Sequence, residues 1–263
     1  MGLVKDILAM PNDSQTKTVV VASMLCLVCS VVVSTVAVGL KPQQEANKAL
    51  DKKRNILQIA GMLREGASID ELFNEIEPRL VDLDTGEFVD DIDPATYDQR
   101  KAAKDPAASR ALSKDEDVAS IRRREKLAAV YLVREEEELK TIILPMHGYG
   151  LWSTMYGFMA LEGDGQTITG FGFYEHGETP GLGGEVDNPK WKALWPGKQV
   201  YTGAGDVGIE LIKGTVSGST PDAQYKVDGL AGATLTSRGV SNLLQYWLGD
   251  MGFRPFLNKL RQG

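Results

Sequence analysis

The sequence contains few of the residues that metal binding and nucleophilic catalysis most often use. Its 263 residues include two histidines and two cysteines, and both cysteines, Cys26 and Cys29, lie inside one apolar run. A free cysteine in such a run behaves as a small hydrophobic residue, and no histidine or third cysteine is close enough in sequence to complete a metal site. We therefore predict no metal site; ligands completed by a partner's helices are the alternative.

Positive charge and aromatic residues are also scarce. Lysine and arginine together number 29 against 36 acidic residues, which gives a formal net charge of -7, and aromatics make up 7% of the chain. A nucleic-acid partner requires a basic surface that displaces counterions from phosphates, and single strands also require stacking platforms. The composition therefore excludes nucleic acid as the expected partner.

Long hydrophobic runs are absent except for one. Residues 18–40, TVVVASMLCLVCSVVVSTVAVGL, carry no charge. A helix of this length crosses a hydrocarbon core of about 30 Å, whereas the apolar part of a cleaved signal peptide is normally about 7–15 residues long. We predict a short N-terminal segment over 1–17, one transmembrane helix in membrane lipid over 18–40, and a stalk helix over 41–66.

The remaining residues, 67–263, have the pattern of one α+β domain. Ser68 and Glu71 have capping-box spacing and predict a helix that ends at Pro78. A hairpin is expected around residues 84–86, and the charged residues 95–127 suggest a solvated helical excursion.

Strands predominate after Leu127. Residues 128–133, 139–146, 155–162, 166–176 and 208–214 have strand patterns, with a hairpin signal at Gly163-Asp164-Gly165. A helical apolar stripe follows over 240–248. We expect an antiparallel sheet with flanking helices packed against one side.

The stretch DGLAGATLTSRGV, residues 228–240, has the pattern of a phosphate-binding helix start. Gly232 and Ala233 let the backbone approach a bulky group closely, and the free N–H groups of a helix start favour a phosphate beside Thr234. Thr236 or Ser237 would cap the helix. The alternative is an ordinary loop-to-helix junction with a capping hydroxyl.

This stretch resembles the site at which FMN is joined by a phosphoester to threonine in the FMN-binding domains of bacterial redox pumps. Further motifs, NEIEPRLVDLDTGEFV, LPMHGYGLWSTMYGF, FYEHGETPGLGGEVDNPKWKALWPGK and YWLGDMGFRPFL, resemble the C subunits of sodium-translocating NADH:quinone reductases over nearly the whole chain. One position departs from the motif, because Ala231 stands where a serine or threonine is usual. The acceptor Thr234 is retained, so we expect attachment to survive.

The resemblance also implies the surroundings of the flavin. It places Glu178, Thr179, Leu182 and Gly183 of the glycine-rich loop against the ring, where apolar contact and a few directed polar groups are needed. Leu151 and Trp152 are cofactor contacts or core residues, and Lys213 is a phosphate partner or a solvated lysine. His147 is interpreted as structural. The expected cofactor residues are Leu151, Trp152, Glu178, Thr179, Leu182, Gly183, Lys213, Asp228, Gly232, Ala233, Thr234 and Thr236.

The resemblance implies an electron-transfer protein that relays electrons between cofactors of its partner subunits and acts on no diffusible substrate itself. The alternatives are the homologous G subunit of an Rnf-type complex, a membrane-tethered adaptor without a cofactor, and a threonine-nucleophile hydrolase. A hydrolase needs a base beside the threonine, and neither His147 nor His176 has a triad visible in the sequence.

Two arguments disagree on the side of the membrane that the large domain occupies. Basic residues near the apolar run favour a cytoplasmic domain, since Lys5 and Lys17 precede the run and Lys41, Lys48, Lys52, Lys53 and Arg54 follow it. The resemblance implies a domain in the periplasm, anchored in the bacterial inner membrane, where an exported transferase modifies the threonine. Long domains translocate largely regardless of charge, so we expect the periplasmic orientation.

Overall fold

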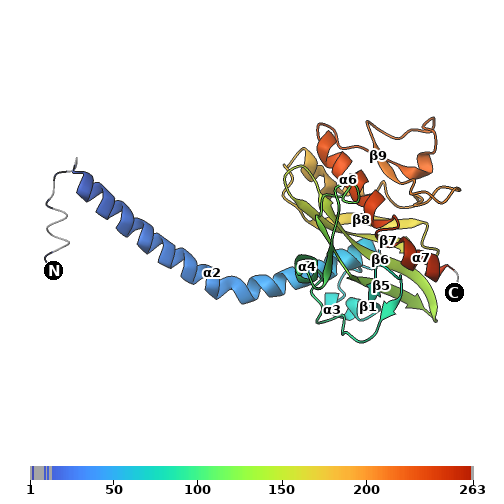
Figure 1. Ribbon diagram of the computed structural model, residues 1–263, viewed down its shortest axis with the longest axis horizontal. Coiled ribbons are helices and arrows are strands. Elements are labelled where there is room, and N and C mark those ends of the chain that lie inside the picture. The colour runs from blue at the N-terminus through green and yellow to red at the C-terminus, as the bar shows by residue number, and fades with distance from the viewer. Residues whose placement is uncertain (1, 3–8, 10, 12–13, 262–263) are drawn as a thin grey trace. The chain divides into compact units, whose positions relative to one another are not determined.

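The computed structural model of the protein describes residues 14–261 together with residues 2, 9 and 11, and it divides into two compact units, residues 1–50 and 51–263 (Figure 1). Most of the predicted N-terminal segment 1–17 lies outside the described residues. The unit boundary at 50/51 precedes the expected start of the globular domain at 67, because residues at the end of the predicted stalk belong to the globular unit.

One helix, α2 (Gln15–Ile59), contains the predicted transmembrane segment and most of the predicted stalk. Among the described residues it is the one helix long and apolar enough to cross a membrane, since an 18-residue window within it has a mean hydropathy of 2.6, and every residue from 21 to 40 is exposed. The helix ends at Ile59 and does not continue to residue 66. Its last residues are not a solvated stalk, since Ile56, Leu57 and Ile59 are buried within the globular unit.

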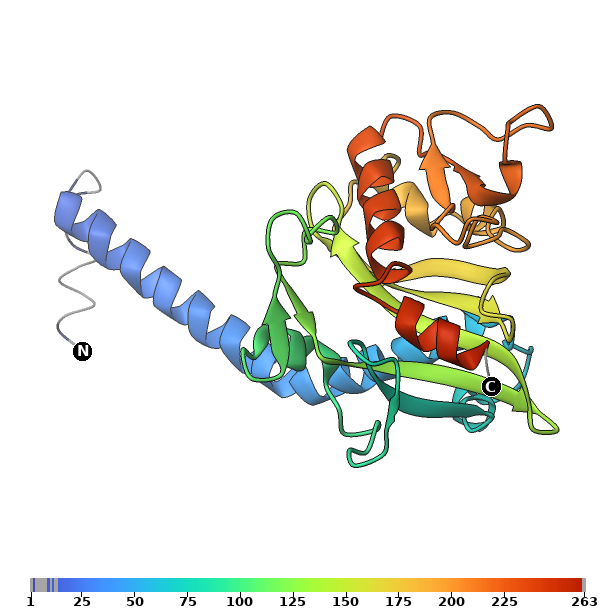
Figure 2. The same ribbon diagram turned by 45° about the vertical axis from the view of Figure 1, so that its right-hand side comes forward.

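The globular unit is built on a six-stranded antiparallel sheet with strand order β2-β1-β5-β6-β7-β8 (Figure 2). Hairpins connect most neighbours, so strands that follow each other in sequence also lie side by side. The strands are β1 (Ile76–Asp82), β2 (Phe88–Val89), β5 (Leu127–Glu135), β6 (Glu138–Tyr149), β7 (Thr154–Glu162) and β8 (Ile168–Glu175). The predicted α+β class and antiparallel sheet are confirmed, as are the hairpins around 84–86 and 163–165.

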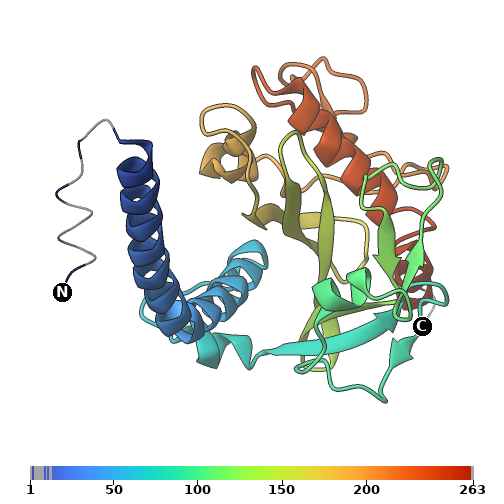
Figure 3. The ribbon, with the colours of Figure 1, turned by 60° about the vertical axis from the view of Figure 1, so that its left-hand side comes forward.

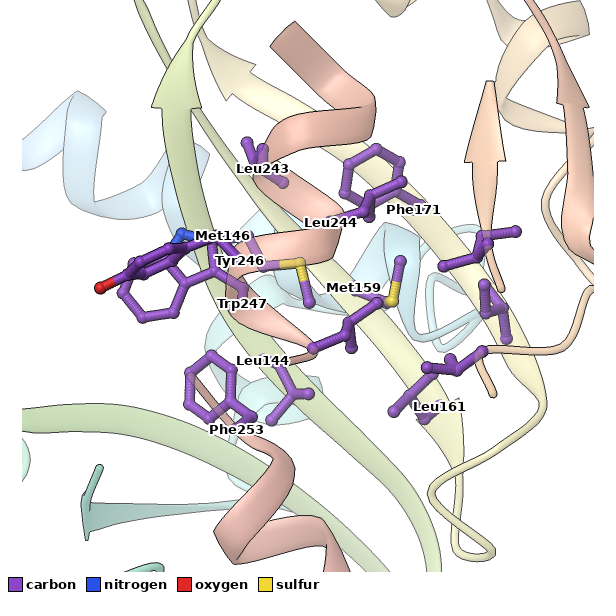
Figure 4. Packing of buried hydrophobic residues seen from close by; sticks show 14 of the residues in the cluster. Leu144, Met146, Met159, Leu161, Phe171, Leu243, Leu244, Tyr246, Trp247 and Phe253 are labelled. Carbon is purple, nitrogen blue, oxygen red and sulfur yellow. The ribbon is translucent and has the colours of Figure 1, made fainter. Parts of the chain in front are cut away.

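Helices cover both faces of this sheet, not one face as expected. Alternation along β5 sends Val130 and Leu132 into the larger core, with α6 (Thr234–Trp247) and α7 (Arg254–Leu260). Tyr131 and Val133 point into a second core with the end of α2 and α3 (Ile69–Phe73). Figure 3 shows the end of α2 and α6 on opposite sides of the sheet, and Figure 4 shows the larger core beneath α6.

The helix predicted to run from Ser68 to Pro78 is shorter than expected. α3 ends at Phe73, and Ile76 and Pro78 belong to β1. Proline is acceptable there because β2 pairs only with Leu80 and Val81, which leaves one side of Pro78 at an unpaired edge of the sheet. Ser68 is the N-cap residue, but its side chain makes no capping hydrogen bond within the described residues.

Residues 95–127 are not a solvated helical excursion. They form α4 (Gln99–Lys104) and an antiparallel pair, β3 (Ser109–Ala111) with β4 (Arg123–Glu125). Arg124 is 1% exposed and Glu125 is fully buried.

Shorter elements follow β8: the 3₁₀ helix η1 (Gly183–Asp187), α5 (Pro189–Lys192) and a second 3₁₀ helix, η2 (Ala223–Tyr225). The strand expected over 208–214 is β9 (Glu210–Ile212), which pairs in parallel with β10 (Lys226–Asp228) in a separate two-stranded sheet.

Candidate functional site

The site is organised by the N-terminal end of α6, which begins at Thr234, before the predicted capping residues Thr236 and Ser237. Gly232 has φ +74°, a left-handed conformation that glycine adopts without strain, and Ala233 is the N-cap residue. The first helical hydrogen bond runs from the Ser237 N–H to the Ala233 carbonyl at 3.0 Å. The amides of residues 234–236 precede that bond and point out of the helix end, where an anion is favoured.

The three hydroxyls of the first helical turn differ in availability. Thr234 is exposed, and its hydroxyl makes no hydrogen bond within the described residues. Thr236 is 1% exposed and donates to Glu178 Oε2 at 2.6 Å. Ser237 Oγ accepts from the Leu230 N–H at 2.9 Å and donates to the Ala233 carbonyl at 3.1 Å. Neither Thr236 nor Ser237 caps the helix as expected, and Thr234 offers the accessible hydroxyl.

Glu178 connects this helix start to two loops. Its carboxylate accepts from the Leu151 N–H at 3.1 Å and the Trp152 N–H at 2.9 Å as well as from Thr236. Burial raises the pKa of Glu178, but the hydrogen bonds from Thr236 and from the amides of residues 151–153 outweigh it, so the pKa lies below its usual value. Glu178 is therefore ionised at neutral pH, and with 5% exposure it faces inward.

Two glycines make room for this carboxylate. A Cβ on Gly150 would lie 2.6 Å from Glu178 Oε1, and a Cβ on Gly183 would lie 2.7 Å from Glu178 Oε2 and 2.6 Å from Thr236 Oγ1. Gly239 plays a similar part within α6, where a Cβ would lie 2.5 Å from the Tyr149 carbonyl oxygen. The loops can approach α6 this closely only without side chains at these positions.

We expect Gly183→Ala to destabilise the protein by about 1–3 kcal/mol, the usual cost of an extra methyl group in a packed site. The new methyl would push Glu178 and Thr236 apart. Urea unfolding of the full-length protein in detergent, followed by tryptophan fluorescence, measures the loss. Gly203→Ala is the matched control, because its Cβ would have open space. Equal stability of the two variants would contradict the close packing at Gly183.

Exposed apolar side chains surround the helix start. Leu151 is 38% exposed, Trp152 65%, Leu182 45% and Leu235 52%; we call these four residues the apolar rim. The loop amides of Leu151 and Trp152 are fixed by Glu178, and Leu182 Cδ2 lies 3.0 Å from where a Gly232 Cβ would be. Large apolar residues are rarely left exposed together without a ligand or partner.

The structure brings most of the expected cofactor residues together, but not all in the expected roles. Thr179 is exposed, and its carbonyl accepts from Leu182 and Gly184. The Asp228 carboxylate accepts from the Val216 N–H at 2.7 Å and thus shapes the loop after β9. Lys213 is exposed on that loop and makes no ion pair within the described residues, so its role at a phosphate stays a prediction. No metal-ligand cluster occurs among the residues the structure describes.

The two histidines have separate positions. His147 lies between the rings of Tyr156 and Trp247, at centroid distances of 5.5 and 4.9 Å, and burial lowers its pKa to about 4. It is therefore a neutral ring in the packing, as interpreted from the sequence.

His176 has both ring nitrogens in use. Nδ1 accepts from the Glu178 N–H at 3.2 Å, and Nε2 lies 2.8 Å from Asp187 Oδ2. Neither nitrogen is directed at Thr234, so this pair does not supply the base that a threonine hydrolase needs. The sequence pattern did not indicate that His176, Ser153 and Gly150 organise the site. The one feature of the sequence that could have indicated them was the glycine beside the loop.

Comparison with known proteins shows which family the chain belongs to. Residues 150–249, which include the apolar rim and α6, match the family model described as the FMN-binding domain. The chain is 57% identical to the C subunit of the Na(+)-translocating NADH-quinone reductase of Pseudomonas aeruginosa, over 96% of this chain and 98% of that protein. The chain belongs to the family of C subunits of this oxidoreductase.

Other members of the family agree. The C subunit of the Vibrio alginolyticus reductase is 52% identical over 97% of this chain and 99% of its own length. The crystal structure of Shewanella oneidensis NqrC has a TM-score of 0.76 and 36% identity, covering 83% of this chain and all of that one. These matches favour the reductase over the G subunit of an Rnf-type complex, and the FMN-binding domain argues against an adaptor without a cofactor.

Proposed function

We propose that the chain is an electron-transfer subunit of a sodium-translocating NADH-quinone reductase and that it carries FMN joined to Thr234 by a phosphoester. The exposed Thr234 hydroxyl at the free amides of α6 carries the proposal, because a phosphate is favoured at that point. When bound, FMN supplies the electron-accepting and electron-donating chemistry. Its partners would be the other subunits of the complex.

The residues present fit such a group. The helix start offers N–H donors to the phosphate, and Gly232 and Ala233 leave the approach open. The apolar rim offers contact area to a ring system and shields one side of it from water. Glu178, expected beside the ring, accepts hydrogen bonds from the loop that carries Leu151 and Trp152 and from Thr236.

Peptide mapping of protein from its native host tests the attachment. Trypsin should release residues 227–238, which hold Thr234, Thr236 and Ser237. We expect this peptide to gain the mass of FMN less one water, and fragmentation should place the addition on Thr234. An unmodified peptide, with no flavin fluorescence in the denatured protein, would overturn the proposal.

We further propose that α2 anchors the protein in the inner membrane and that the globular unit is periplasmic. The relatives extend over the apolar helix as well as the domain. The resemblance implies a transferase outside the cytoplasm, and a domain on that side would present Thr234 to it. The positive residues after the apolar run oppose this orientation, but charge has little influence on long translocated domains.

Protease added to intact spheroplasts measures the orientation. We expect external protease to digest residues 51–263 completely, because the whole globular unit would face outward. A cytoplasmic protein should stay intact in the same sample as the control. Protection of the domain until the membrane is broken would show that the charge count gave the correct orientation.

A further inference from the structure

The carboxylate of Glu178 is the point at which three separate parts of the chain meet. It belongs to the glycine-rich loop, it accepts from amides of the loop between β6 and β7, and it accepts from Thr236 in α6, 58 residues further along the chain. The bond from Thr236 is 2.6 Å long and buried. Hydrogen bonds to an ionised acceptor are stronger than those between neutral groups.

The hydrogen bonds around Glu178 leave little freedom for the loops. Ser153 Oγ accepts from the Gly177 N–H at 2.6 Å, and His176 accepts from the Glu178 N–H. These two bonds fix the backbone of the glycine-rich loop at Gly177 and at Glu178. The carboxylate also lies close to the backbone of Gly150 and Gly183, where an added Cβ would be 2.6 and 2.7 Å from its two oxygens. Removing Glu178 would leave part-buried amides and the buried Thr236 hydroxyl without this acceptor.

We infer that Glu178 and Thr236 form a positioning latch for the flavin site. The latch holds the apolar rim on its two loops against the first turn of α6. It also withdraws the Thr236 hydroxyl, so that Thr234 presents the accessible hydroxyl of the turn. Glu178 acts through the loops and not by touching the cofactor. The role of the latch at a flavin site rests on the proposed function. The hydrogen bonds of the latch itself involve residues of this chain only.

Four variants of the full-length protein in detergent separate the parts of the latch. Thr236→Val removes the donor with little change in shape, and Thr236→Ser keeps it. Glu178→Gln keeps one oxygen for the loop amides but replaces the charged acceptor Oε2 with an NH2 group, which can only donate to the Thr236 oxygen. Glu185→Gln is the matched control, since it removes a charge from the same region, where the carboxylate accepts from Asn188 at 2.7 Å.

Hydrogen exchange of the flavin-free protein gives the first result. We expect the amides of residues 151–153 to exchange at least roughly tenfold faster in Thr236→Val and Glu178→Gln, since a hydrogen bond to a charged group contributes more to stability than one between neutral groups. Thr236→Ser and Glu185→Gln should exchange like the wild type. Unchanged protection in both latch variants would overturn the inference.

The flavin-loaded protein gives the second result. We expect Thr236→Val and Glu178→Gln to keep the label on Thr234 but to shift the flavin absorption bands, with the wild-type spectrum restored in Thr236→Ser. Glu178→Gln should also raise the midpoint potential, because a negative charge near the flavin disfavours added electrons.

If labelled wild type and latch variants have the same spectrum and potential, the latch is wrong while the proposed function stands. If the wild type carries no flavin, the proposed function fails and hydrogen exchange still decides the latch.

Discussion

Replacing Thr234 with valine should remove all covalently bound flavin from the protein. A phosphoester needs a hydroxyl oxygen, and valine differs from threonine by a methyl group in its place. Both residues are β-branched and Thr234 is exposed, so the first turn of α6 should keep its conformation. In-gel fluorescence after denaturation and the mass of peptide 227–238 measure the loss.

Thr236→Val is the matched control, because it removes a hydroxyl of the same turn. That hydroxyl is buried and donates to Glu178, so the label should remain on Thr234. Ser237 is engaged by Leu230 and Ala233 and should not accept the flavin in place of Thr234. A flavin that persists in Thr234→Val, or that moves to Thr236, would show that accessibility does not select the attachment residue.

Local patterns predicted the presence of this helix and the hairpins because their causes are local, although the helix starts before the predicted caps Thr236 and Ser237. The glycine and alanine before Thr234, followed by an apolar stripe, indicate both a close approach and a helix, and α6 begins at that residue. The turn at residues 163–165 joins β7 and β8 as its glycines suggest. The nature of the site as an FMN-binding domain came from the resemblance of longer motifs, not from periodicity.

The position of Glu178 could not be predicted from spacing. The partners of its carboxylate lie 25 or more residues away, in residues 151–153 and Thr236, and only the folded sheet brings them together. The resemblance placed Glu178 beside the flavin ring, whereas its side chain is almost fully buried among its own hydrogen-bond donors. The sequence predicted that the glycine-rich loop is part of the site. It did not predict which atoms fix the position of that loop.

The second face of the sheet was missed for a related reason. Residues 41–66 were predicted to form a stalk helix outside the domain, yet Ile56 and Leu57 cover one face of the sheet. Residues 122–126, RRREK, likewise suggested a solvated surface. Two of these charged side chains are buried because β4 lies against the core and each has polar partners: Arg124 donates to the Met251 carbonyl at 2.7 Å, and Glu125 accepts from Gln99 at 2.5 Å.

The burial of Glu125 predicts a pH dependence of stability. Burial raises the pKa of Glu125 to about 7, and Gln99 and Arg124 only partly offset this. The unfolded chain ionises near the ordinary value of about 4.3, so the folded protein binds more protons between these two values. The contribution of Glu125 to stability is therefore complete below the unfolded pKa and is lost as the pH rises to 7 and slightly beyond.

Glu125→Gln removes this titration while keeping the size of the side chain. The difference in unfolding free energy between variant and wild type should shift in favour of the variant by on the order of 3 kcal/mol between pH 4.5 and pH 8. Taking that difference cancels the titration of His147, Glu178 and other groups common to both proteins, and its change between the two pH values removes the fixed cost of the substitution. Urea unfolding of the full-length protein at several pH values, followed by tryptophan fluorescence, measures this shift.

Glu135→Gln, at the exposed turn between β5 and β6, should keep the wild-type profile. Parallel stability curves for wild type and Glu125→Gln would mean that Glu125 keeps its charge in the folded protein, paired more tightly with Arg124 than its burial indicates.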